Sequence, residues 1–167
     1  MEKSNFLLEL IKSFIISIVI VFIIINFIAL PVRVSGDSMY PTLHNGDFGF
    51  SGIFTKLFDY KRYDVVVIEN ENTQQKIVKR IIGLPNELIT YKDSQLYVNE
   101  LPVEEPFLDE SVYTDDFSIQ LGDNEYFCLG DNREVSRDSR YYGAFRKDDI
   151  VSRKILVLFP FSDLGIY

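Results

Sequence analysis

The sequence predicts a mostly β protein with an N-terminal single transmembrane helix followed by an extracytoplasmic antiparallel β-sheet domain. Residues 13–30 form an uncharged run that consists almost entirely of Ile, Val, Phe and Leu. At about 1.5 Å per residue a helix of this length measures about 27 Å, close to the roughly 30 Å of hydrocarbon in a bilayer. The rest of the chain alternates short β-branched segments with polar turn segments, which is typical of β-sheet proteins.

The apolar run is interpreted as a retained anchor. A cleaved signal peptide would end in an Ala-x-Ala-like site, and none follows Leu30. A buried core helix, the alternative, would carry a polar face, whereas two serines and one asparagine alone interrupt this run. Lys3 and Lys12 precede the run and Arg33 follows it, a slight positive-inside bias that places the N-terminus in the cytoplasm. The expected division is a short cytoplasmic N-terminus at 1–12, a transmembrane anchor at 13–31, and an extracytoplasmic β-rich domain at 32–167.

The strands are expected where β-branched and aromatic residues cluster between turn formers. The segments 87–91 and 95–99 flank a Lys-Asp-Ser turn and predict a hairpin. The segment 100–124 is acidic and contains two prolines, so it is predicted to be a long surface excursion. The complete set of expected strands is 64–68, 75–82, 87–91, 95–99, 125–129 and 150–159.

Composition excludes several classes of function. The formal net charge is −8 and no basic cluster is present, which argues against binding to nucleic acid. A single cysteine, Cys128, excludes an internal disulfide, and with His44 as the one histidine it argues against a structural zinc site. Cys128 is expected to be a small buried residue.

Ser38 is a candidate nucleophile. It lies in a Gly-Asp-Ser turn before Pro41, where a serine is most often only a turn residue. Its position favours function, because the seven residues from Pro31 to Ser38 span at most about 25 Å and keep the hydroxyl near the membrane face.

A serine nucleophile needs a base, and Lys79 is the candidate. A lysine can act as a base if burial lowers its pKa well below the unperturbed value of about 10.4. Strand alternation places Ile77, Lys79 and Ile81 on one face, with Arg80 pointing away, so the amine would stand between two aliphatic side chains. The alternative, an outward lysine on a half-exposed strand, remains open at this point.

A third group of residues lies between Gly130 and Gly143. Its density of turn formers and opposite charges predicts an ordered loop in which Asp138 and Arg140 pair with each other or with neighbours. A purely structural loop is one interpretation. Its hydroxyls and amides could also orient a buried lysine ammonium.

Four strings carry a resemblance to a known family. They are Ser-Gly-Asp-Ser-Met-Tyr-Pro-Thr from residue 35, Tyr-Asp-Val-Val-Val from residue 63, Lys-Arg-Ile-Ile-Gly-Leu-Pro from residue 79, and Gly-Asp-Asn-Arg-x-x-Ser-x-Asp-Ser-Arg-x-x-Gly from residue 130. In this order they resemble the signature boxes of bacterial type I signal peptidases, also called leader peptidases. The length and single anchor resemble the short members typical of Gram-positive bacteria.

The resemblance implies a signal-peptidase-type β fold and a Ser-Lys dyad, a variant of the serine-protease triad. Ser38 would be the acylating nucleophile and Lys79 the general base. The implied supporting residues are Gly36, at the place where some members add a serine hydroxyl to the oxyanion site, Ser136, which would position the lysine, and the ion pair of Asp138 and Arg140. Met39 and Ile77 are expected to line the substrate pocket. The resemblance implies no metal or organic cofactor.

The implied activity is removal of N-terminal signal peptides from exported pre-proteins, with cleavage after small residues at positions −1 and −3. The expected partners are these pre-proteins, as they emerge from the secretion machinery, and membrane lipid. Two departures from the family pattern stand out: Pro85-Asn86-Glu87 replaces the usual Pro-Gly-Asp, and Tyr63 replaces the usual glycine before Asp64.

Two other hypotheses belong to different classes. One is a signal-peptidase-like assembly factor or chaperone that binds secreted or pilus subunits without cleaving them, which an absent dyad would favour. The other is a self-cleaving serine-lysine protease of the kind fused to SOS repressors. The anchor and the lack of a DNA-binding region argue against the second.

Overall fold

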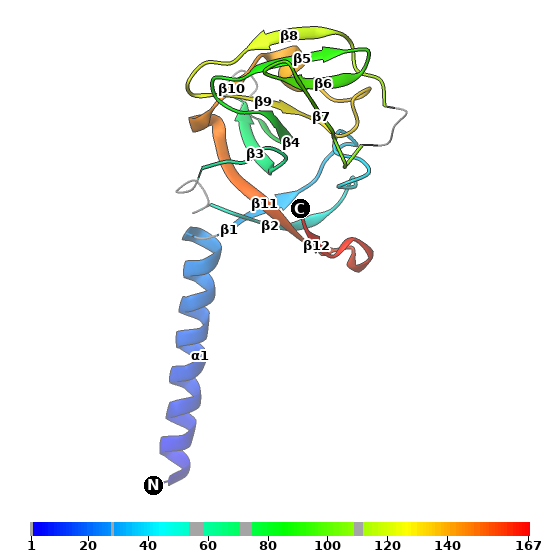
Figure 1. Cartoon of the computed structure of the whole chain (residues 1–167). Helices are drawn as coiled ribbons and strands as arrows, with labels where there is room; N and C mark the ends of the chain where they lie inside the picture. Colours follow the sequence, from blue (N-terminus) through cyan, green and yellow to red (C-terminus); the bar gives the residue numbers. More distant parts are fainter. Residues whose placement is uncertain (1, 28, 54–58, 71–74, 109–111) are drawn as a thin grey trace.

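The structure is a computed structural model that describes residues 2–27, 29–53, 59–70, 75–108 and 112–167. It consists of a long N-terminal helix, α1 (Glu2–Phe27), and a body built from two antiparallel sheets. Figure 1 shows α1 extending away from the body, which begins at β1 where the helix ends. The prediction of a mostly β, antiparallel domain is confirmed.

The larger sheet has eight strands. Its order is β1-β2-β11-β3-β4-β9-β10, and β12 pairs with β11 off this path. Strand β4 therefore lies inside the sheet, between β3 and β9, which places Lys79 away from a sheet edge. The strands are β1 (Ala29–Arg33), β2 (Phe48–Gly52), β3 (Val65–Asn70), β4 (Gln75–Gly83), β9 (Glu125–Leu129), β10 (Phe145–Arg146), β11 (Ile150–Phe159) and β12 (Gly165–Ile166).

The smaller sheet has four strands in the order β7-β6-β5-β8. The predicted hairpin forms its centre, and its strands pair in register from Ile89 with Val98 to Lys92 with Gln95. The bounds are β5 (Leu88–Lys92), β6 (Gln95–Val98), β7 (Leu101–Val103) and β8 (Phe117–Gln120). Among the described residues, three short helices complete the body: α2 (Ser139–Tyr142), η2 (Lys147–Asp149) and η3 (Phe161–Asp163).

All six expected strands are present, with bounds that differ by at most two residues. The prediction that 100–124 is only a surface excursion is wrong, because β7 and β8 lie in this segment and form both edges of the smaller sheet. Pro102 is accommodated because β7 is an edge strand, where one missing backbone donor costs no internal hydrogen bond. Part of the segment is also buried: the Glu105 carboxylate pairs with the Arg133 guanidinium, whose side chain is 1% exposed.

Both departures from the family pattern fall where the backbone is left-handed. Tyr63 has φ of 72° and Asn86 has φ of 66°, a region that glycine enters without strain. Asparagine is the non-glycine residue that tolerates this region best. Tyr63 is held by other contacts: its hydroxyl donates to Glu104 O at 2.6 Å and its ring packs edge-on against Phe107. The backbone conformation is thus kept without the glycines.

Three buried apolar clusters hold the body together. One lies under β1, β3 and β11, one between β3, β4, β9 and β11, and one joins the two sheets. Cys128 belongs to the second cluster and is fully buried, as the sequence predicts. Burial raises the pKa of its thiol, so it remains an uncharged packing residue. The largest fully buried side chains are Tyr91, Phe127, Met39, Leu43, Ile68, Ile81, Ile82, Ile89, Leu96, Leu129, Ile150 and Ile155.

Helix α1 packs little against the body. The large apolar side chains that the structure describes between Phe6 and Phe22 are 48% to 67% exposed. The helix ends at Phe27 and β1 starts at Ala29, so the last residues assigned to the expected anchor belong to the larger sheet. Within the part of the chain that the structure describes, no helix combines the length and apolarity needed to cross a membrane.

Candidate active site

Ser38 lies in the loop that joins β1 to β2. The loop is closed by turn hydrogen bonds, in which Tyr40 N donates to Asp37 O at 3.1 Å and Leu43 N donates to Met39 O at 2.9 Å. Met39 and Leu43 are buried in the cluster under β1, β3 and β11, and they fix the loop to the body. The loop therefore presents Ser38, which is only partly buried, on a rigid support.

Lys79 reaches Ser38 from the middle of β4. Its Nζ lies 2.7 Å from Ser38 Oγ, within hydrogen-bond reach. The side chain is buried, with the residue 3% exposed, and β4 pairs on both sides, so the strand cannot swing the amine out to water. The Lys79 side chain therefore points into the body and not outward to solvent.

The environment of Lys79 disfavours its charged form. Desolvation by burial lowers the pKa of Lys79 from 10.5 to about 8, although the carboxylates of Asp138 and Asp131 act in the opposite direction. The strand neighbour Ile81 is fully buried and contributes to this apolar setting. A fraction of the lysine is therefore neutral near neutral pH and can accept a proton from a hydroxyl at 2.7 Å.

The loop from Gly130 to Gly143 packs against Ser38. Asn132 N donates to Ser38 O at 3.1 Å. Asp138 is fully buried and accepts hydrogen bonds from Gly130 N at 3.1 Å and from Arg140 Nε and Nη2, both at 2.9 Å. Arg140 and Asp138 thus pair with each other and hold the two ends of this loop together.

Ser136 and Ser38 both lie close to Gly130 of this loop. A Cβ added to Gly130 would come within 2.2 Å of Ser136 Oγ and 2.4 Å of Ser38 O, so no side chain fits at position 130. Ser136 Oγ is buried and has no hydrogen-bond partner among the described residues. The structure brings Ser136 beside Ser38, without a hydrogen bond between its hydroxyl and Lys79 Nζ.

A buried polar network beside the dyad was not predicted from the sequence. Arg80 is 8% exposed and donates to Asp131 from Nε at 2.9 Å and from Nη2 at 2.6 Å. Thr42 Oγ1 also donates to Asp131, and the guanidinium lies 4.1 Å from the centre of the Phe107 ring. The alternation of β4 predicts that Arg80 points away from Lys79, but no local pattern shows that its partner lies 51 residues later.

Ser38 and Lys79 together line two hollows. The first, of about 400 Å³, lies between the end of β1 and the start of β4 and is also lined by Met39 and Ile77. The second, of about 440 Å³, lies between the Ser38 loop and the 130–143 loop and includes Ile77 and Gly36. Met39 is 1% exposed, so it contributes mainly to the floor of the first hollow. Gly36 has φ of +84° and its N–H donates to Asn45 Oδ1 at 3.1 Å.

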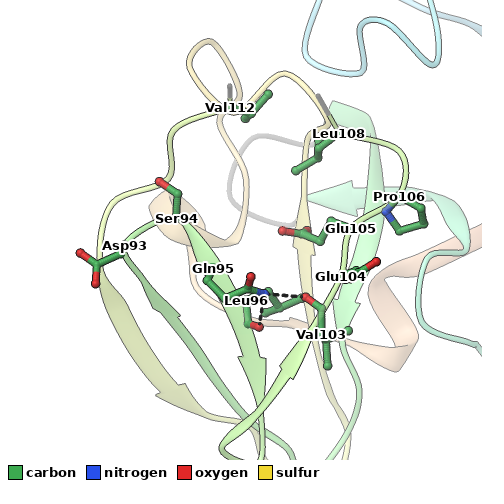
Figure 2. A pocket seen from close by; sticks show the side chains of 10 residues that line it. All are labelled: Asp93, Ser94, Gln95, Leu96, Val103, Glu104, Glu105, Pro106, Leu108 and Val112. Atoms are coloured by element: carbon green, nitrogen blue, oxygen red, sulfur yellow. Dashed lines mark hydrogen bonds between the residues drawn. The ribbon is translucent and has the colours of Figure 1, made fainter. Parts of the chain in front are cut away.

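A larger hollow, of about 570 Å³, lies away from these residues in the smaller sheet. Figure 2 shows its lining, in which Gln95 Nε2 donates to Leu96 O and Val103 O at 3.0 Å. Its wall carries three carboxylates, on Asp93, Glu104 and Glu105. It contains none of the residues predicted for catalysis, so size alone does not mark the active site.

Comparisons with known proteins identify the family of this chain. Residues 7–159 match the family described as signal peptidase, peptidase S26. The chain is 39% identical to "Signal peptidase I S" of Bacillus subtilis strain 168, over 98% of this chain and 95% of that protein. It is 34% identical to "Signal peptidase IB" of Staphylococcus aureus, over 94% of this chain and 92% of that protein. A crystal structure of a signal peptidase I from Enterococcus faecalis aligns with a TM-score of 0.53 and 29% identity, over 57% of this chain and 97% of that one. Extended similarity in sequence and fold shows that this chain belongs to the signal peptidase family, peptidase S26.

Proposed function

We propose that this protein is a membrane-bound serine endopeptidase that removes N-terminal signal peptides from secreted pre-proteins through a Ser-Lys dyad. The observation that carries the proposal is the 2.7 Å contact between Ser38 Oγ and the amine of a buried lysine. A hydroxyl beside a desolvated amine is the arrangement that nucleophilic catalysis by serine requires. Membership of the family supports the substrate class.

Acylation follows from this contact. Neutral Lys79 takes the proton of the Ser38 hydroxyl as Oγ attacks the scissile carbonyl carbon, which yields a tetrahedral oxyanion and an ammonium. Collapse of this intermediate breaks the peptide C–N bond, and the ammonium returns the proton to the leaving amine. Water then attacks the acyl-enzyme with Lys79 again as the base, which releases the signal peptide and restores Ser38.

The oxyanion needs a preorganised donor. We assign this role to the backbone N–H of Ser38, with Gly36 opening space at the place where some family members carry a hydroxyl. Loss of one such donor typically costs about 10²- to 10³-fold in rate. Gly36 adopts φ of +84°, a conformation that a serine would enter only with strain, so the missing hydroxyl is consistent with the local backbone.

The 130–143 loop supplies the supporting residues. Ser136 is assigned to orient Lys79, since its hydroxyl is buried beside Ser38 and lacks another partner in the described residues. The negative charge of Asp138 raises the pKa of Lys79, and the positive charge of Arg140 lowers it. Because the two side chains pair, their opposite effects on the amine largely offset each other. The base therefore keeps a pKa set mainly by desolvation.

The substrate would bind as an extended strand through the two hollows that share Ser38 and Lys79. Met39 and Ile77 line the first hollow, and their bulk would limit the −1 and −3 positions of the pre-protein to small side chains. We assign the uncharged run 13–30, which begins within α1 and continues past its last residue, as the membrane anchor. Its exposed apolar side chains need a non-aqueous surrounding, and it joins the body directly at the strand that leads to Ser38.

The test is cleavage of a detergent-solubilised pre-protein with an Ala-x-Ala site by the wild type and by Ser38→Ala, with sequencing of the product N-terminus. We expect the wild type to cut directly after the second alanine and Ser38→Ala to release no product. Ser35→Ala is the control, because this neighbouring serine is exposed and lines the same hollows without contacting Lys79. A folded wild type that binds the pre-protein and never cuts it would support the non-cleaving assembly factor instead.

The rate of cleavage should depend on pH through Lys79. Because the pKa of Lys79 is lowered to about 8, kcat/KM should rise about tenfold per pH unit below pH 8 and level off above it. The measurement is initial-rate cleavage from pH 6 to 9.5, with circular dichroism at each pH to show that the fold is retained. A rate that does not change between pH 6 and 9 would mean that Lys79 is not the base.

A further inference from the structure

Three side chains that could bind a metal ion converge outside the dyad. They are His44 and Asp47, at the end of the loop that carries Ser38, and Asp163, in η3 near the C-terminus. One potential ligand atom from each lies within 4.8 Å of the others. The sequence argues against a zinc site built from cysteines and histidines, but it does not show that the fold brings two carboxylates to the single histidine.

The buried carboxylate of Asp47 points to a missing partner. Asp47 is 2% exposed, and its Oδ2 accepts the His44 N–H at 2.9 Å. Its Oδ1 is buried and has no hydrogen-bond partner among the described residues. An ionised oxygen without a partner is costly to bury, and a bound cation would offset this cost.

The spacing of the other two ligand atoms also suits a metal. His44 Nδ1 lies 3.1 Å from Asp163 Oδ2. Two ligands of a tetrahedral zinc ion with bonds of about 2.0 to 2.2 Å lie about 3.4 Å apart, so these two atoms would need to separate by only a few tenths of an ångström to share an ion. The His44 side chain is 46% exposed and that of Asp163 is 20% exposed, which gives an ion and its water ligands access from solvent.

We propose that His44 Nδ1, Asp47 and Asp163 bind one divalent transition-metal ion, with water completing the coordination. Imidazole nitrogen with carboxylate oxygen is a donor set that favours zinc over magnesium, which prefers oxygen alone and retains its water. The ion would connect the Ser38 loop to η3 and β11. Val34 is hydrogen-bonded to the turn that carries Asp47, since its N–H donates to Asp47 O and its carbonyl accepts from Gly46 N. A bound ion would therefore stabilise the chain on both sides of Ser38.

The test uses the full chain in detergent micelles without a polyhistidine tag, titrated with Zn²⁺. Because His44 is the single histidine of the chain, its imidazole NMR resonances report the site without ambiguity. We expect these resonances to move and to saturate at one ion per chain. We also expect the unfolding temperature to rise by roughly 5 to 10 °C at a free zinc concentration about 100 times the dissociation constant.

Asp163→Asn and Asp47→Asn should each weaken zinc binding at least tenfold, whereas Asp123→Asn, which removes an exposed carboxylate outside the cluster, should not. Asp163 is partly exposed, so its variant should fold even if the Asp47 variant does not. Millimolar Mg²⁺ should not displace the zinc. Unmoved His44 resonances, or equal affinity in wild type and Asp163→Asn, would overturn the proposal. Neither outcome depends on cleavage activity.

Discussion

Replacement of Lys79 by methionine is expected to lower kcat/KM for pre-protein cleavage by about 10⁴-fold or more. Methionine fills nearly the same space but cannot accept the Ser38 proton, and removal of one member of such a catalytic unit typically costs this much. The measurement is single-turnover cleavage at pH 9, where the wild-type amine is mostly neutral because its pKa is about 8.

The matched control is Lys76→Met, because Lys76 lies on the same strand and lines the first hollow but is exposed. Its activity should stay within a few-fold of wild type. If Lys79→Met keeps more than a tenth of the wild-type activity, the dyad mechanism fails.

Lys79→Met should not lower the free energy of unfolding. The pKa of Lys79 is about 8 in the folded chain and 10.5 in the unfolded chain, so the folded state binds fewer protons between these values. Burying this lysine therefore lowers the free energy of unfolding of the wild type, by the full amount below pH 8 and by less and less as the pH rises to 10.5. The melting temperature of Lys79→Met should therefore exceed that of wild type by the largest margin below pH 8, which separates a catalytic loss from a folding defect.

The second large effect is expected at Asp131, where alanine should reduce the free energy of unfolding by about 3 to 5 kcal/mol. The carboxylate is 2% exposed and holds the buried Arg80 guanidinium through two hydrogen bonds. Removal of one partner leaves an uncompensated charge in the interior, which costs far more than the pair contributes. Urea denaturation of the detergent-solubilised chain measures this difference.

Two further variants test the cause. Asp123→Ala removes an exposed carboxylate and should change stability by less than about 0.5 kcal/mol. The double variant Arg80→Met with Asp131→Leu removes both charges, so it should be more stable than Asp131→Ala alone. If the double variant loses as much stability relative to wild type as Arg80→Met and Asp131→Leu lose separately when their losses are added, the unpaired charge is not the cause.

The family signature and the strands were predictable because each depends on local sequence. The β-branched runs at β3, β4 and β11 gave strands within two residues of their observed bounds. The hairpin of β5 and β6 was predictable because its turn residues lie between two alternating segments. β7 and β8 were missed, since they have only three and four residues and their segment is acidic.

The buried charges could not be predicted for a related reason. Arg133 and Glu105 are 28 positions apart, and Arg80 and Asp131 are 51 apart, so no local window contains both members of either pair. An isolated arginine or glutamate is expected on the surface, and only a partner brought close by the fold makes burial favourable.

The sequence by itself determined the β class, the candidate nucleophile and base, and the family to which the chain is similar, because each can be recognised from short contiguous segments. Only the tertiary structure decided that Lys79 is buried 2.7 Å from Ser38. It also decided that Asp163 meets His44 across more than a hundred residues of chain. The physical reason is that pKa values, ion pairs and ligand sets depend on distances and desolvation, which arise only when separate strands and loops pack together.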